Sequence, residues 1–99
     1  MVRRPGVDDL ALDTVNVEKI ARHGILPRQV YEVLDNGGSV FRNRADPTAP
    51  YVFIELDNDG QCIAMLIRPT DVATVWRPVT AWYCKPSECA RLGQDRRRR

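Results

Sequence analysis

The stretch that most constrains the fold is Pro50–Arg68, in which two apolar runs flank a cluster of turn residues. The runs are Tyr51–Leu56 and Cys62–Ile67, and Asp57-Asn58-Asp59-Gly60 separates them. Gly60 can adopt a positive φ without steric cost, and Asn or Asp side chains can hydrogen-bond the backbone of such a turn. The stretch therefore predicts a β-hairpin.

Apolar residues occupy both faces of this predicted hairpin. The second run is apolar at every position, and in the first run only Glu55 is charged. A hairpin with two apolar faces belongs in the middle of a sheet and has to be covered on both sides. We therefore expect the rest of the chain to extend or cover it.

Two helices are predicted before the hairpin. The first spans residues 14–23, with Asp13 or Thr14 as its N-terminal cap. The second begins at Pro27, which suits a first helical position, and it ends at Asn36-Gly37-Gly38. Together these helices would cover one face of the sheet.

Shorter elements complete the expected fold. Val7–Leu12 allows an edge strand, Ser39–Arg44 is a second strand, and Val75–Tyr83 is the last one. Pro78 cannot donate to a ladder, so the last strand lies at an edge or carries a bulge there. A short helix, Pro86–Leu92, follows. This order predicts an α+β fold with two N-terminal helices on one face of an antiparallel sheet.

A chain of 99 residues is long enough for one hydrophobic core, and we expect a single domain over residues 1–95. Residues 96–99 are four arginines, which we expect to form a disordered basic tail. Without them, 11 of the 15 basic residues remain against 13 acidic ones. The body of the protein is thus close to neutral, and affinity for a polyanion requires a local patch or the tail.

No apolar run approaches the roughly 20 residues of a membrane span, and the first residues lack the apolar core of a signal peptide. We therefore expect a cytoplasmic protein without membrane contact. Three cysteines, an odd number, argue against a disulfide framework. With one histidine, a closed four-ligand zinc site would also need Asp or Glu, so we expect reduced, packed thiols and neither metal nor cofactor.

Several motifs resemble one protein family. The run Ala21-Arg22-His23-Gly24-Ile25, followed by the helix Gln29–Leu34, resembles a turn and helix of BrnT-type toxins, which belong to the RelE superfamily of bacterial type II toxin–antitoxin systems. The Asp-Gly hairpin, the segment Trp76–Ala81 and Glu88 are similar to that family's C-terminal half. The resemblance covers residues 10–92. It implies a RelE-like fold and a toxin that inhibits ribosomes or cleaves RNA, neutralised by a co-transcribed DNA-binding antitoxin.

The chain departs from this family at one basic position. The family commonly has arginine after the Ile/Val-Ser/Thr-Ala run, where this chain has Trp82. Arg77 matches an earlier basic position of the family. Arg68 and Arg91 are the candidates for the missing second cation.

Cleavage of RNA by its own 2′-hydroxyl needs a base, an acid and cations that stabilise the phosphorane charge. The candidate catalytic residues are His23, Arg77 and Glu88. Each has a structural alternative. His23 can interact with the last carbonyls of the first helix, Arg77 can pair with Glu55 or Asp71, and Glu88 can favour a helix dipole.

Aromatic residues on the last strand are candidates for contacts with bases. Trp76, Trp82 and Tyr83 can each contribute about 1–3 kcal/mol by stacking, or they can serve as hot spots for a protein partner. In a regular strand Trp76, Thr80 and Trp82 share the face opposite Ala81. The candidate RNA-binding residues are Arg68, Trp76, Trp82 and Arg91.

Two functions from different classes are compatible with these patterns. The first is a toxin that acts on RNA or the ribosome as a metal-independent endoribonuclease. The alternative is a non-catalytic protein-interaction module that keeps the scaffold but has lost the cationic site. In both cases the Pro86–Leu92 helix looks too small to cover the second face of the sheet. We therefore expect self-association, or a partner's helix or strand on that face.

Overall fold

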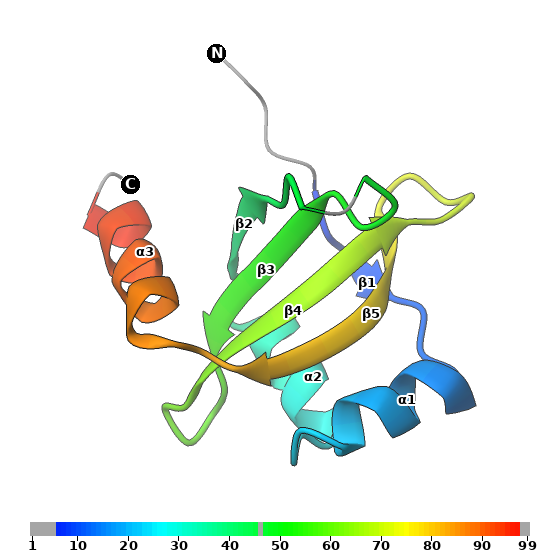
Figure 1. Ribbon diagram of the computed structural model, residues 1–99, viewed down its shortest axis with the longest axis horizontal. Helices are drawn as coiled ribbons and strands as arrows, with labels where there is room; N and C mark the ends of the chain where they lie inside the picture. Colours follow the sequence, from blue (N-terminus) through cyan, green and yellow to red (C-terminus); the bar gives the residue numbers. More distant parts are fainter. Residues whose placement is uncertain (1–5, 46, 98–99) are drawn as a thin grey trace.

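The computed structural model describes residues 6–45 and 47–97. Its elements, in order, are β1 (Asp9–Leu10), α1 (Thr14–Ala21), α2 (Pro27–Asp35), β2 (Ser39–Arg42), β3 (Tyr51–Leu56), β4 (Cys62–Pro69), β5 (Val75–Tyr83) and α3 (Pro86–Arg97). They form an α+β fold around a five-stranded mixed sheet in the order β1-β5-β4-β3-β2 (Figure 1). Within the described ranges, no helix has the length and apolar character needed to cross a membrane.

The predicted hairpin is confirmed as the pair β3–β4 in the middle of the sheet. The two strands pair from Tyr51↔Ile67 to Leu56↔Cys62 without interruption. Gly60 has a φ of +82°, the left-handed conformation that the turn requires.

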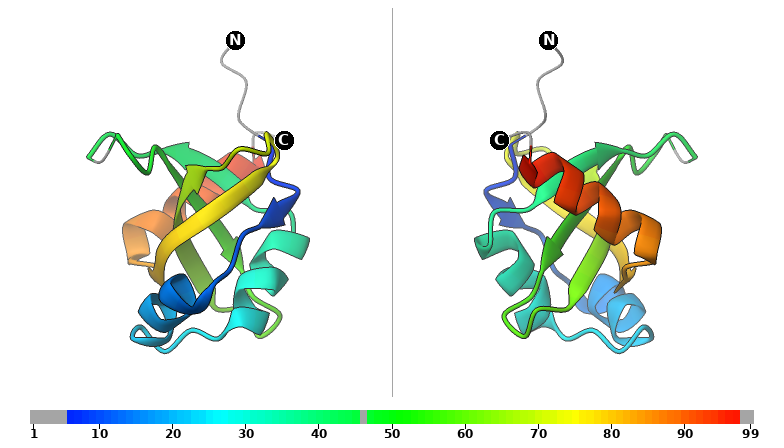
Figure 2. Two further views of the ribbon diagram at one scale, coloured as in Figure 1. Left: turned by 90° about the vertical axis from the view of Figure 1, so that its right-hand side faces the viewer. Right: turned by 90° about the vertical axis from the view of Figure 1, so that its left-hand side faces the viewer.

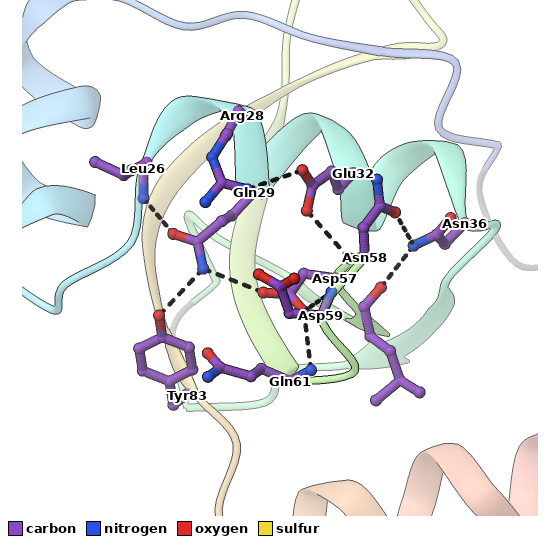
Figure 3. A network of polar contacts seen from close by, with 11 residues as sticks. Leu26, Arg28, Gln29, Glu32, Asn36, Asp57, Asn58, Asp59, Gln61 and Tyr83 are labelled. Carbon is purple, nitrogen blue, oxygen red and sulfur yellow. Dashed lines mark hydrogen bonds and ion pairs between the residues drawn. The ribbon is translucent and has the colours of Figure 1, made fainter.

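A network of hydrogen bonds holds the β3–β4 turn against α2 (Figure 3). The buried carboxylate of Asp57 accepts bonds from the backbone of Asp59 at 2.9 Å and of Gln61 at 2.8 Å. It also accepts a bond from the side chain of Gln29, on α2, at 3.2 Å. Asn36, at the end of α2, donates to the Leu56 carbonyl. These bonds fix the position of α2 along the hairpin.

The edge strand β1 pairs in parallel with β5, through Asp9↔Val75 and Leu10↔Trp76. The predicted edge strand is therefore present, but the expectation of a purely antiparallel sheet is wrong at this edge. The chain leaves β1, runs through both helices to the far edge at β2 and returns by an antiparallel meander. Its last strand, β5, therefore reaches β1 in the same direction.

A bulge interrupts β5 at Pro78, as its missing N–H predicts. Leu66 pairs with Thr80 whereas Ile67 pairs with Pro78, so β5 has one extra residue at this point. Because of this extra residue, the side chains of β5 that precede the bulge lie on the faces opposite to those expected for a regular strand. Trp76 consequently packs in the same cluster as Ala81, and the expectation that it lies on the opposite face is wrong.

The cluster between the sheet and the helices α1 and α2 forms the main core of the protein. Figure 2 shows these two helices on the side of the sheet away from α3. The buried residues of this cluster are Leu10, Ile20, Ile25, Val30, Val33, Val40, Phe53, Ile63, Met65, Ile67, Trp76 and Ala81. Local sequence sets the ends of α1: Asp13 and Asn16 form a reciprocal capping box, and Gly24 turns the chain at a φ of +77°. Both helices begin and end close to the predicted residues.

The second face of the sheet is covered by α3, which lies across it in Figure 2. This helix continues through Gly93 to Arg97, so the expected end before Gly93 is wrong. Leu92 packs on the fully buried Ile54 and Ala64, and the Ser39 hydroxyl donates to Asp95 at 2.5 Å. These contacts outweigh the cost of about 1 kcal/mol for a helical glycine.

The length of α3 corrects two further expectations. The helix is long enough to cover the central strands, so the argument from an uncovered face is wrong, while self-association stays a prediction. The predicted tail begins inside α3, because the helix includes the backbone through Arg97. Residues 98 and 99 lie outside the described residues.

Candidate functional site

A shallow pocket of about 150 Å³ lies between α1 and the strands β4 and β5. Three of its lining side chains are cationic and come from three elements: Lys19 from α1, Arg68 from β4 and Arg77 from β5. The other lining residues are Val15, Pro78 and Val79. We call this the basic pocket. A site with three cations and apolar walls suits a phosphate group or another compact anion.

The bulge at Pro78 determines where the two arginines meet. Beyond it, Arg68 and Arg77 are directly opposite each other on β4 and β5. Like charges in directly opposite positions destabilise a sheet. The two arginines therefore favour a nearby anion, either a carboxylate of the protein or a bound ligand.

Arg77 forms an ion pair with Asp13, the N-terminal cap of α1. The ion-pair partner of Arg77 is therefore Asp13, and not Glu55 or Asp71 as the structural alternative predicted. The hydrogen bond from Arg77, followed by that from the Asn16 amide, lowers the pKa of Asp13 below its ordinary value of 3.8. Asp13 is thus an anion at neutral pH, and it offsets one of the three positive charges.

The predicted catalytic residues do not converge. His23 is exposed beyond the C-terminal end of α1, whereas Asp13 and Arg77 meet at its N-terminal end. The eight residues of α1 span about 12 Å. Glu88 lies on α3, across the sheet from α1. Only Arg77 of the three belongs to the basic pocket.

Glu88 has local structural contacts. Its carboxylate accepts bonds from the Trp82 indole N–H at 3.0 and 3.2 Å and from the Lys85 amide at 2.8 Å. The last bond caps the first turn of α3. These contacts support the structural alternative for Glu88.

The two tryptophans do not form a common surface for stacking bases. Trp76 is only 6% exposed, donates its indole N–H to the Gly6 carbonyl, and meets the Tyr51 ring edge-to-face at 5.5 Å. Trp82 packs in the cluster under α3, on the other face of the sheet. Tyr83 is 41% exposed but its hydroxyl is bonded to Gln29 and to the Gly24 carbonyl.

The predicted RNA-binding arginines are also separated. Arg68 lies in the basic pocket. Arg91 is on α3, where its guanidinium lies 4.3 Å from the centre of the Phe41 ring. Arg68 is thus the residue that accompanies Arg77. Sequence reasoning missed Lys19, although its position four residues after the exposed Val15 places both on one side of α1.

The three cysteines form a second cluster, which the sequence did not predict. The sulfur atoms of Cys62, Cys84 and Cys89 all lie within 4.8 Å of one another. Burial raises the pKa of Cys62 to about 11 and also raises the pKa of Cys84. These two thiols are therefore protonated at neutral pH and are not activated nucleophiles.

No family model, no curated protein and no solved structure matches this chain. The basic pocket can bind and stabilise a phosphate charge, and the cysteine cluster offers three sulfur atoms at one point.

Proposed function

We propose that this chain is the toxin component of a bacterial type II toxin–antitoxin system, and that it binds and cleaves RNA at the basic pocket. The observation that carries the proposal is the opposed pair Arg68 and Arg77 with Lys19 beside it. A phosphate of the RNA backbone compensates their mutual repulsion. The same three cations would stabilise the additional negative charge of a phosphorane.

The resemblance to BrnT-type toxins supports the same function. The proposal includes a RelE-like arrangement of the fold, supported by the packing of α1 and α2 in one cluster against the sheet. Arg77 keeps the role that its match to the family implies. Arg68, directly opposite, takes the place of the cation that Trp82 replaces.

In the proposed mechanism the pocket provides charge stabilisation, and cleavage needs no metal ion. Arg68, Arg77 and Lys19 hold the scissile phosphate, while the 2′-hydroxyl of the RNA attacks it and the bond to the 5′-oxygen of the next nucleotide breaks. The products are a 2′,3′-cyclic phosphate and a 5′-hydroxyl, and water carries the proton from the attacking oxygen to the leaving oxygen. His23 has no role in this mechanism, because it lies beyond the opposite end of α1 from the Arg77–Asp13 pair. The mechanism omits Glu88 and Trp76, whose polar groups already bond within the protein. A cognate DNA-binding antitoxin would hold the toxin inactive in the cytoplasm.

A second candidate is a non-catalytic interaction module. The observation in its favour is that Trp82 occupies a position where the resembling family has arginine, and that its side chain bonds to Glu88. Such a protein would keep the scaffold and bind a protein partner without acting on RNA.

Growth arrest on expression distinguishes the two candidates. We expect induction of the wild-type chain without an antitoxin to stop growth, and the double variant Arg68→Gln/Arg77→Gln to restore it, because the pocket loses two of three cations. The control is Arg44→Gln, an exposed residue beyond β2 at the opposite edge of the sheet from β5. The readouts are colony counts and the integrity of total RNA, at matched levels of soluble protein.

Arrest by the wild type that the double variant leaves unchanged would contradict the site. Absence of arrest and of RNA cleavage by the wild type, combined with tight binding of a protein partner, would favour the interaction module.

A further inference from the structure

The cysteine cluster is built from three separate elements. Cys62 is the first residue of β4, Cys84 directly follows β5, and Cys89 lies near the start of α3. Cys62 and Cys84 are neighbours across the ladder, since the Cys84 amide donates to the Cys62 carbonyl at 2.9 Å. Their sulfur atoms lie 2.6 Å apart. The strand pair thus supplies two sulfurs, and α3 places the third beside them.

The cluster opens to solvent through a pocket of about 450 Å³. Gln61 and Tyr83 line this pocket together with the three cysteines. Cys89 is exposed, whereas Cys62 and Cys84 are half-buried. A small ion can therefore reach all three sulfur atoms from one side.

Close packing of the side chains does not explain why three sulfur atoms lie within 4.8 Å of one another. Cys62 and Cys84 also pack against the apolar cluster under α3, but packing alone does not require the exposed Cys89 to place its sulfur beside theirs. A bound metal ion displaces the protons of such thiols, and the resulting thiolates are soft ligands that select ions such as Zn²⁺ or Cu⁺. The negative charge of Glu88, which acts on both Cys62 and Cys84, adds to a field that favours a cation.

The geometry fits a metal ion after a small adjustment. Zinc–sulfur bonds of about 2.3 Å in a tetrahedral site place the sulfurs about 3.8 Å from one another. The largest separation within the cluster is below 4.8 Å, and the close pair Cys62–Cys84 has to open by about 1 Å. Rotation about the Cα–Cβ bonds of the two residues provides that movement.

We propose that Cys62, Cys84 and Cys89 form a zinc site, with solvent in the fourth position. The ion joins β4, β5 and α3, and so it fastens α3 to the sheet. This site is separate from the basic pocket and takes no part in RNA cleavage. The ion would hold the helix that covers the second face of the sheet, and its solvent position distinguishes the site from a closed four-ligand zinc site.

The test is a zinc titration of the reduced, chelator-stripped protein in competition with a chromophoric chelator. We expect one Zn²⁺ per chain, and with Co²⁺ a thiolate charge-transfer band together with the visible bands of a tetrahedral site. Each single substitution, Cys62→Ser, Cys84→Ser or Cys89→Ser, should weaken zinc binding by about 100-fold or more. Zinc should also raise the melting temperature of the wild type.

The matched control is Gln61→Ala, which changes a residue lining the same pocket without removing a sulfur. It should bind zinc like the wild type. Circular dichroism confirms that each variant is folded before titration. The proposal is overturned if the folded wild type binds zinc no more tightly than the triple serine variant. It is also overturned if Co²⁺ gives an octahedral spectrum, or if Cys62 and Cys84 remain in a disulfide under reducing conditions.

Discussion

Replacing Gly38 by alanine is expected to lower the free energy of unfolding by about 3 kcal/mol, the upper end of what overpacking a core costs. Gly38 lies between α2 and β2, against the ring of Phe53. A Cβ at position 38 would lie 2.3 Å from two carbon atoms of that ring. The ring is itself only 3% exposed within the main core, so it cannot move aside without displacing its neighbours. Urea unfolding measures the loss.

The matched control is the same substitution in α3. An alanine Cβ at Gly93 meets nothing within 4 Å, so Gly93→Ala should stabilise the protein by about 0.5–1 kcal/mol. A second test is Gly38→Ala combined with Phe53→Leu, in which the smaller side chain relieves the clash and the alanine costs less. If Gly38→Ala lowers the free energy of unfolding by less than about 0.5 kcal/mol, the close contact between Gly38 and the Phe53 ring is wrong.

Truncation of Asp57 should produce the second large effect. Asp57→Ala leaves the Asp59 and Gln61 amides and the Gln29 side chain without their common acceptor (Figure 3). At about 1 kcal/mol for each lost bond, the protein should lose about 3 kcal/mol. Asp57→Asn keeps the oxygen that accepts both turn amides and loses the bond from Gln29, so it should cost about 1 kcal/mol.

The control for this series is Asp59→Ala, in the same turn but with an exposed side chain, which should change stability by less than about 0.5 kcal/mol. Equal effects of Asp57→Ala and Asp59→Ala in chemical denaturation would contradict the role of the network.

The pH dependence of stability provides an independent test of Asp57. Burial opposes its ionisation, but hydrogen bonds from Gln61, Gln29 and Asp59 outweigh burial, so its pKa is lowered from 3.8. A lowered pKa in the folded state contributes stability above pH 3.8, and this stability is lost as the pH falls through the folded value. The advantage of the wild type over Asp57→Asn should therefore shrink below pH 3.8 in denaturation curves. An advantage that stays constant would contradict the lowered pKa.

The sequence predicted those parts of the fold that local chemistry determines. The β3–β4 hairpin follows from Gly60 and the two apolar runs that flank its turn, and α2 begins at Pro27 as its fixed φ favours. The bulge at Pro78 follows from its missing N–H. In each case a few neighbouring residues carry the whole signal.

Features that depend on distant contacts were not predicted. Gly93 predicts the end of the last helix from local sequence, but tertiary contacts of Leu92 and Asp95 stabilise the helix on both sides of it. Trp76 is buried because the extra residue at the bulge turns its side chain to the face of the sheet that carries Ala81. Helix signals in the sequence describe local propensity, and such contacts override it.

The two clusters were predictable to different degrees. Arg68 and Arg77 were recognised as cations, but only the register of β4 and β5 places them opposite each other. The spacing of Cys84 and Cys89 matches no common metal motif, because the third sulfur comes from Cys62 on the neighbouring strand. A ligand set assembled across a sheet has no short sequence signature.

The most direct test of the central claim is the salt dependence of RNA binding. The measurement is fluorescence anisotropy of a labelled single-stranded RNA, carried out over a range of salt concentrations. The wild type should bind with a steep salt dependence. Arg68→Gln/Arg77→Gln should bind more weakly and lower the slope of log affinity against log salt by about 0.7, since the two arginines hold the same phosphate and each phosphate contact to a single strand contributes about 0.7. Arg44→Gln should keep the wild-type slope. Equal slopes and affinities for the double variant and the wild type would contradict the basic pocket as the RNA site.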